Sequence, residues 1–297
     1  MNRKPAARLA IPTTDGLQLS ALVEGPADAP TLVLVHGYPD NLHVWDAVVD
    51  ALKDRYRLVR YDVRGAGRSD APTSLAGYRL PQLLADFRRV IDHTSPDAPV
   101  HLVGHDWGSI QSWEFATEPA LAGRIASFTS LSGPGLDHVA IAARTPRAGL
   151  QRVREMAASW YVGAFHLPAL GPLTWKLGLA RHWHRVLARL ERLPDAPRHG
   201  SQARDGINGI NLYRANVLPR LLRPRPRSAI APVQLLVATR DPFVKPYMLK
   251  DLGRWAPQFQ RAEISAGHWL PLTQPLWVAE QIDRFVQLLE IAHRKAA

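Results

Sequence analysis

An aspartate flanked by glycines, Asp106, lies directly after an apolar run in the segment VHLVGHDWGS (100–109). The pattern Gly104-x-Asp106-x-Gly108 has the spacing of a nucleophile elbow, a sharp strand-to-helix turn that lifts one side chain above a sheet. A carboxylate that attacks an alkyl carbon forms an ester, which water can cleave at the enzyme's own carbonyl carbon, whereas a serine would leave a stable ether. We therefore expect Asp106 to be a nucleophile rather than a cap of the following helix.

An acid and a histidine follow later apolar runs: Asp241 comes after VQLLVAT (233–239) and His268 after RAEISA. The chain order nucleophile, acid, histidine is found in hydrolases with a catalytic triad. Imidazole has a pKa suited to a general base for water, and a carboxylate can hold its ring and stabilise the imidazolium. Asp137, which follows the apolar run 125–132, is a second candidate for the acid. We favour Asp241 and leave Asp137 open.

These side chains need elements that bring strand ends together, and the apolar pattern predicts them. Strands are expected as a pair within 7–24 around the turn Thr14-Asp15-Gly16, and then at 31–37, 56–62, 100–105, 125–132, 233–239 and 261–266. Helices are expected at 42–53, 80–93, 108–117, near 246–255 and at 276–292. The alternation predicts an α/β fold with a mostly parallel, eight-stranded sheet flanked by helices, and ligands bind beyond the carboxyl ends of such strands.

The alternation stops after Gly133-Pro134-Gly135. Residues 136–228 contain only helical stretches interrupted by prolines, and the proline-rich connector LLRPRPRSAIAP closes the segment. We interpret residues 133–228 as a helical lid inserted after the sixth strand. The first part of the core is then expected at 1–132 and the second at 229–297.

Composition narrows the chemistry of the 297-residue chain. It has no cysteine, which excludes disulfides, thiolate metal sites and cysteine nucleophiles. The start MNRKPAARLAIPTTDG lacks the apolar core of a signal peptide, and no apolar run approaches the roughly 18 residues of a membrane span. We expect a cytoplasmic protein with no integral membrane segment, no metal and no cofactor.

The net charge of +11 is concentrated in one part of the chain. Residues 133–231 hold 16 Lys and Arg against 5 Asp and Glu, whereas the rest holds 21 of each kind. No nucleic-acid-binding motif accompanies the excess, so we favour a solvated basic face over nucleic-acid recognition. A weak contact between the basic lid and a membrane surface is left open, and the oligomeric state is not predicted.

Six segments in the expected order carry a resemblance to a known family. They are HGYPDN, GHDWGS, SWYVGAFHLP (159–168), GINLYRANV (209–217), ATRDPFV and AGHWLPLTQP. Over essentially its whole length the chain resembles the epoxide hydrolases of the α/β-hydrolase superfamily. Around HGYPDNLHVWD and RYDVRGAGRS it is also similar to the hydrolase half of bacterial proteins that fuse such a domain to a short-chain dehydrogenase. No Gly-x-x-x-Gly-x-Gly pattern follows a strand, so we expect the hydrolase half alone.

The resemblance implies that the chain opens a hydrophobic epoxide to a vicinal diol with water, through an ester of Asp106. The backbone N–H groups of Tyr38 and Trp107 would form an oxyanion hole, and a cis peptide bond would precede Pro39. The lid tyrosines Tyr161 and Tyr213 would donate hydrogen bonds to the epoxide oxygen. The substrate pocket would be lined by His36, Pro39, Phe165 and Trp269.

Two other functions fit parts of the pattern. Haloalkane dehalogenases share the aspartate and the following tryptophan, but Tyr38 stands where they usually place a second halide donor. Fluoroacetate dehalogenases have an arginine directly after the nucleophile, where this chain has Trp107. A hydrolase fold kept as a non-catalytic binding module is the remaining alternative, and the presence of a nucleophile, an acid and a histidine disfavours it.

Overall fold

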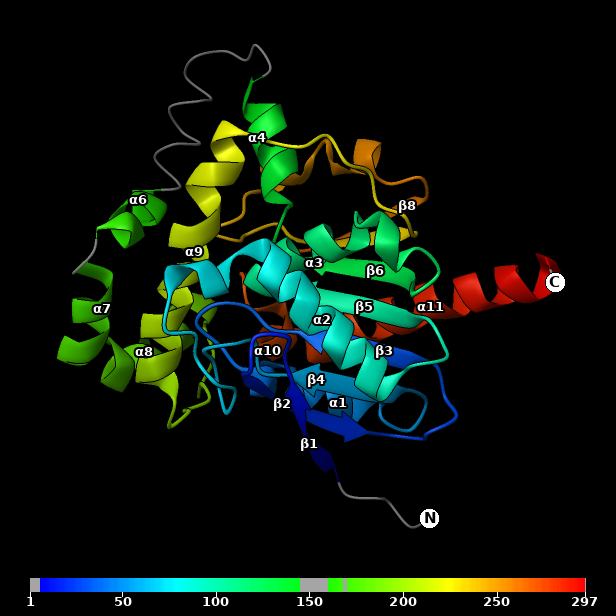
Figure 1. Ribbon diagram of the computed structural model, residues 1–297, viewed down its shortest axis with the longest axis horizontal. Coiled ribbons are helices and arrows are strands. Elements are labelled where there is room, and N and C mark those ends of the chain that lie inside the picture. Colours follow the sequence, from blue (N-terminus) through cyan, green and yellow to red (C-terminus); the bar gives the residue numbers. More distant parts are fainter. Residues whose placement is uncertain (1–5, 145–159, 168–169, 297) are drawn as a thin grey trace.

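The computed structural model describes residues 6–144, 160–167 and 170–296. Within them, eight strands form one sheet in the order β1-β2-β4-β3-β5-β6-β7-β8 (Figure 1). The strands are β1 (Ala7–Pro12), β2 (Gln18–Glu24), β3 (Thr31–Val35), β4 (Arg57–Tyr61), β5 (Val100–His105), β6 (Ile125–Leu131), β7 (Val233–Ala238) and β8 (Phe259–Ile264). The pairs β1–β2 and β2–β4 are antiparallel, and all other neighbours are parallel. The predicted eight-stranded, mostly parallel sheet is confirmed.

Helices cover both faces of the sheet, which explains why its central strands are buried along their whole length. Every residue of β3, β5 and β7 is buried. On one face lie α2 (Leu80–Thr94) and α3 (Trp107–Ala116), whose Phe87 and Phe115 rings stack with centroids 4.6 Å apart. On the other face α1 (Asp46–Leu52) and α11 (Pro275–Ala296) bury aliphatic side chains in a second core.

The segment near 246–255 differs from its prediction. Instead of one helix it forms two short 3₁₀ turns, Pro246–Leu249 and Leu252–Trp255. Gly253 lies inside the second turn, and glycine disfavours a continuous helix. Leu249 and Leu252 are both buried. The predicted helix 42–53 likewise begins as a 3₁₀ turn, Leu42–Trp45, before α1.

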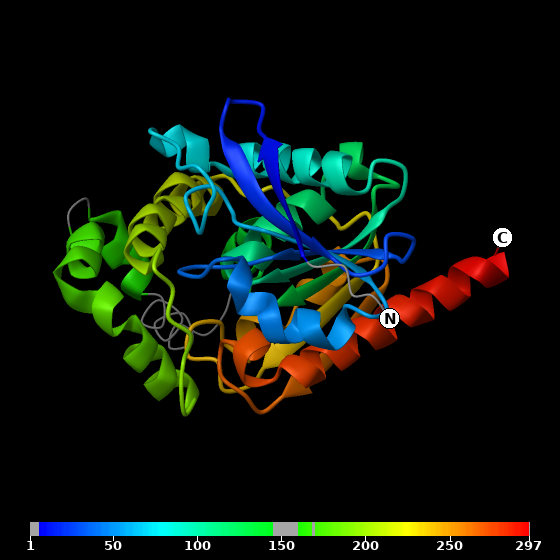
Figure 2. The same ribbon diagram turned by 90° about the horizontal axis from the view of Figure 1, so that it is seen from below.

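Between β6 and β7 the described residues are helical and contain no strand, and we call this part the helical insertion. It comprises α4 (Leu136–Arg144), α6 (Trp160–His166), α7 (Leu170–Thr174), a π-helical segment (Trp175–Leu179), α8 (Ala180–Glu191) and α9 (Gln202–Leu222). Figures 1 and 2 show α7 and α8 at the edge of the molecule opposite the C-terminal end of α11. The division into core and lid at 132/133 and 228/229 stays a prediction. In the described ranges, α11 and every other helix are too short or too polar to cross a lipid bilayer.

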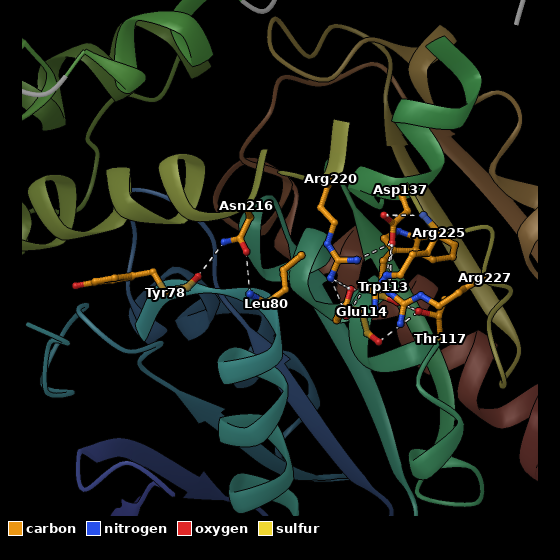
Figure 3. A network of polar contacts seen from close by, with 10 residues as sticks. All are labelled: Tyr78, Leu80, Trp113, Glu114, Thr117, Asp137, Asn216, Arg220, Arg225 and Arg227. Atoms are coloured by element: carbon orange, nitrogen blue, oxygen red, sulfur yellow. Dashed lines mark hydrogen bonds and ion pairs between the residues drawn. The ribbon is translucent and has the colours of Figure 1, made fainter. Parts of the chain in front are cut away.

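Helix α9 is fastened to the core by buried polar contacts (Figure 3). The Asn216 side chain donates to the carbonyl of Tyr78 and accepts from the amide of Leu80, both at 2.8 Å. One turn further along, Arg220 donates to both carboxylate oxygens of Glu114 at 2.9 Å. Because Glu114 lies on α3, which begins directly after Asp106, these contacts connect the helical insertion to the helix that follows the elbow.

We expect Asn216→Ala to lower the free energy of unfolding by about 2–4 kcal/mol, because it leaves two buried backbone groups without partners. Urea unfolding followed by circular dichroism measures this loss. Gln287→Ala, on the exposed face of α11, is the matched control and should change stability by less than about 0.5 kcal/mol. An Asn216→Ala variant as stable as the control would show that these contacts contribute nothing net.

Candidate active site

Asp106 occupies a tight turn between β5 and α3. Its backbone has φ 52° and ψ −121°, a region that non-glycine residues rarely adopt. Neighbouring backbone approaches so closely that only glycine fits: a Cβ on Gly108 would lie 2.0 Å from the Val35 carbonyl oxygen. A Cβ on Gly37 would lie 2.5 Å from the Asp106 Cβ. The glycines therefore permit the turn that presents the Asp106 side chain at the carboxyl ends of β3 and β5.

The two oxygens of the Asp106 carboxylate have different partners. Oδ1 accepts a hydrogen bond of 2.7 Å from the backbone N–H of Tyr38, and Oδ2 lies 3.5 Å from Nε2 of His268. The expected cis peptide between Tyr38 and Pro39 is confirmed. Two backbone amides, those of Tyr38 and Trp107, are expected to face this carboxylate. In the described part of the chain, Tyr38 donates to it and Trp107 does not. One oxygen is thus fixed by an amide, and the other faces an imidazole.

His268 is held from its other side by Asp241. The Nδ1 of His268 donates to Asp241 Oδ2 at 2.8 Å, while Asp241 Oδ1 accepts from the amides of Phe243 and Val244. Burial alone would lower the pKa of His268, but the carboxylates of Asp241 and Asp106 outweigh it and raise this pKa well above its ordinary value. Burial would raise the pKa of Asp241, and the imidazole with the two amides lowers it instead.

The second candidate for the acid, Asp137, lies in a different environment. Its carboxylate accepts from Arg220 at 3.2 Å and from the amide of Arg225 at 3.1 Å. Figure 3 shows it in a group with Glu114 and three arginines at the end of α9. Of the two aspartates, Asp241 is therefore the one in contact with His268.

Three groups around His268 are not among the expected site residues, although Asp40 and His105 lie within the segments HGYPDN and GHDWGS. Glu191 of α8 accepts from the backbone N–H of His268 at 2.9 Å, and Nε2 of His105 donates to the His268 carbonyl at 2.9 Å. Burial lowers the pKa of His105 to about 4, so it is neutral there. Asp40 accepts from the indole of Trp269 at 2.8 Å, and burial raises its pKa to about 7. Together these contacts fix the loop that carries His268.

Tyr38 connects the site to the helical insertion through its side chain. Its hydroxyl accepts from the indole of Trp175 at 2.7 Å and donates to the carbonyl of Gly206 at 3.1 Å. Its ring packs edge-on against those of Phe165 and Tyr213, with centroids 5.6 and 5.4 Å away. The amide of Tyr38 holds Asp106, and its ring is held by the insertion.

Tyr213 of α9 lies beside the elbow, and its buried ring is 4.8 Å from that of Trp107 between centroids. Tyr161 belongs to α6, but its side chain is outside the described parts of the chain, so the expected tyrosine pair stays a prediction.

The structure describes the side chains of all four expected pocket residues. Phe165 is half-buried with its ring 4.9 Å from that of Tyr213, and the Trp269 ring is 4.7 Å from that of His268. Pro39 is buried. His36 is hydrogen-bonded through both ring nitrogens, to the Gly37 carbonyl and the Val63 amide, so it supports the loop. Contact of any of the four with a substrate stays a prediction.

The Asp106 carboxylate, the His268 imidazole and the Asp241 carboxylate thus lie next to one another, and the Tyr38 amide donates to Asp106. Such a set can form a covalent ester and then activate water against it. The described residues hold no group of three or more His, Asp or Glu side chains placed to bind a metal.

Comparison with known proteins gives relatives over most of the chain. The "Probable oxidoreductase EphD" of Mycobacterium tuberculosis is 36% identical over 296 residues, which cover 94% of this chain and 49% of that protein. The chain thus spans about half the length of this relative. "Epoxide hydrolase 3" of Xenopus tropicalis is 26% identical over 294 residues, covering 94% of this chain and 77% of that protein.

Solved structures share the fold. An epoxide hydrolase of Bacillus megaterium superposes with a TM-score of 0.76 at 21% identity, covering 94% of this chain and all of that chain (100%). The family model described as the alpha/beta hydrolase fold matches residues 30–275, which includes the elbow, Asp241, His268 and the helical insertion. With the sheet order and the elbow, this match means that the chain belongs to the α/β-hydrolase family.

Proposed function

We propose that the protein is an epoxide hydrolase that converts a hydrophobic epoxide to a vicinal diol through a covalent ester on Asp106. The observation that carries this proposal is the split environment of the Asp106 carboxylate, with Oδ1 on the Tyr38 amide and Oδ2 facing His268. The names of several relatives support the substrate class. Water is the second substrate, and no cofactor takes part.

In the first step, Asp106 Oδ2 attacks an epoxide carbon. The carbon–oxygen bond of the ring breaks, its electron pair goes to the ring oxygen, and a tyrosine hydroxyl supplies the proton. Tyr213 is the described candidate for this acid, because it lies beside the elbow on α9, and Tyr161 is its expected partner. Protonation matters because an unassisted alkoxide is a poor leaving group, and a positioned acid contributes about 10²–10⁴-fold.

In the second step, His268 takes a proton from water, and the hydroxide attacks Cγ of Asp106. Negative charge develops on Oδ1, where the Tyr38 amide stabilises it. Collapse of this intermediate breaks the bond between Cγ and Oδ2, and the departing alkoxide takes the proton from the His268 imidazolium. The proton of the new Asp106 carboxyl group returns to the tyrosinate left by the first step, and the diol leaves with an oxygen that came from Asp106.

Ester formation also prepares His268 to act as a base. In the free protein, the charges of Asp241 and Asp106 raise its pKa, which favours the imidazolium. The ester of Asp106 is uncharged, so one of the two carboxylates that raise this pKa is lost when the ester forms. The pKa of His268 then falls, and the neutral imidazole is available for the second step.

Haloalkane dehalogenation is the second candidate, and one observation fits it as well as it fits epoxide opening. The indole N–H of Trp107 is buried and has no acceptor among the described residues. A buried donor without a partner costs about 1–3 kcal/mol, and a departing halide could accept from it. An epoxide oxygen could do the same, so the two reactions have to be separated by experiment.

We expect His268→Gln to accumulate the ester, because ring opening does not need the base whereas hydrolysis does. Intact-protein mass spectrometry after incubation with styrene oxide should show one added epoxide mass, located on the peptide that contains Asp106. Asp106→Asn is the matched control and should show no adduct. Absence of an adduct on His268→Gln, while the wild type turns over, would contradict the assignment of both residues.

The Asp106→Asn variant should also lower the pKa of His268, since one of the two charges that raise it is removed. NMR titration of the ring resonances measures this change, and Asp137→Asn, among the arginines, should leave the pKa as it is. A raised pKa stabilises the folded state fully below the unfolded value of about 6.5 and stops doing so as pH rises through the folded value. In Asp106→Asn the free energy of unfolding should therefore fall less as pH rises above about 6.5. An unchanged His268 pKa would show that the charge of Asp106 does not act on it.

Tyr213→Phe should slow opening of epoxides by about 10- to 100-fold, because a hydrogen bond to developing charge is lost. Turnover of 1-bromoalkanes, if present, should change little, since halides leave without a proton. Stopped-flow recording of the intrinsic tryptophan fluorescence during alkylation measures the rate, and Tyr56→Phe, remote from the site, is the control. Equal effects on epoxides and bromoalkanes would make Tyr213 a packing residue and remove the main argument against dehalogenation.

A further inference from the structure

Helix α8 of the helical insertion has two different faces. Trp183, Leu187 and Glu191, spaced four residues apart, face inwards: Leu187 is buried, and Glu191 accepts from the His268 amide. The ring of Trp183 packs on that of Trp269 with centroids 5.9 Å apart. Arg181, Arg185 and Arg189 have the same four-residue spacing but are offset by two positions, and all three are exposed. The inner face contacts the catalytic loop, and the outer face is a row of arginines.

The arginine row lacks counter-charges. Within the described residues, none of the three arginines takes part in an ion pair, whereas Glu114 and Asp137 each pair with arginines at the end of α9. The excess positive charge of the whole chain lies between residues 133 and 231. This face of α8 is therefore an unneutralised basic surface.

Exposed leucines lie on α7 and the π-helical segment, which Figures 1 and 2 show next to α8. Leu170 and Leu173 of α7 are 46% and 47% exposed, and Leu177 of the π-helical segment is 77% exposed. Leu173 and Leu177 are four residues apart, and Gly178, with φ 157°, separates them from α8 by a kink. Lys176 adds a further exposed cation. We call these leucines and the three arginines of α8 the outer patch.

We propose that the outer patch docks the protein on an anionic lipid surface. Leucines next to arginines are the composition of peripheral membrane contacts, in which apolar side chains enter the headgroup region and cations meet anionic lipids. A second copy of this chain is a poorer partner, because it would bring two basic faces together. A nucleic acid would leave the exposed leucines without an apolar environment. An anionic lipid surface offers an apolar environment to the leucines and negative charge to the arginines.

Co-sedimentation with vesicles tests the proposal. The full chain should bind phosphatidylcholine vesicles containing phosphatidylglycerol at low salt, and bind pure phosphatidylcholine vesicles at least tenfold more weakly. Arg181→Gln/Arg185→Gln/Arg189→Gln should weaken binding to the anionic vesicles by about 100-fold, since each cation near such a surface contributes about 1 kcal/mol. Leu173→Ser/Leu177→Ser should weaken it by about tenfold or more.

Matched controls lie outside the helical insertion. Arg79→Gln/Arg240→Gln/Lys250→Gln removes three exposed cations, and Leu276→Ser/Leu288→Ser removes two exposed leucines. Both should change vesicle binding by less than about twofold. Equal binding to both vesicle types, controls as damaging as the patch variants, or a dimer in sedimentation velocity that the leucine variant dissolves would each overturn the proposal. So would tighter binding of duplex RNA through the same arginines.

Discussion

A histidine buried between two carboxylates is the interaction on which the site depends. Burying one cation and two anions is costly unless each charge is paired and its remaining hydrogen bonds are satisfied. Here His268 contacts Asp106 and Asp241, and the backbone amides of Tyr38, Phe243 and Val244 supply the remaining donors. The three groups follow β5, β7 and β8, so the parallel arrangement of these strands places them at one edge of the sheet. Loss of His268 would leave two buried carboxylates without a cation, whereas loss of either carboxylate would leave a single ion pair.

The helical insertion contributes to this arrangement as well as covering it. Glu191 of α8 is hydrogen-bonded to the loop of His268, and Trp175 is hydrogen-bonded to the side chain of Tyr38. Near the C-terminal end of α9, Arg220 is hydrogen-bonded to Glu114 of α3, the helix that begins at the elbow. Residues far apart in the chain thus fix the positions of the nucleophile and the base from opposite sides.

The features that could be predicted from the sequence are those that short stretches of residues determine. Apolar runs identified all eight strands, and the glycines around Asp106 identified the elbow. Strand ends and chain order placed Asp241 beside His268. Glu191 could not be found, because its contact depends on how α8 packs over the loop, and no local pattern encodes that packing. The helix expected near 246–255 is instead two 3₁₀ turns, because the apolar spacing there fits either kind of helix and Gly253 weakens the α-helix.

Tyr38 carries two attachments within one residue, and this has a thermodynamic consequence. Its amide binds Asp106 Oδ1, while its hydroxyl is held between Trp175 and Gly206 of the insertion. A movement of α9 away from the core must therefore either break the hydroxyl contacts or displace the amide. The order of the insertion and the charge on Oδ1 are consequently linked, and linkage is reciprocal. A ligand that immobilises the insertion strengthens the hydrogen bond from the Tyr38 amide to Oδ1. Negative charge that develops on Oδ1 during turnover in return stabilises the contacts between the Tyr38 hydroxyl and the insertion.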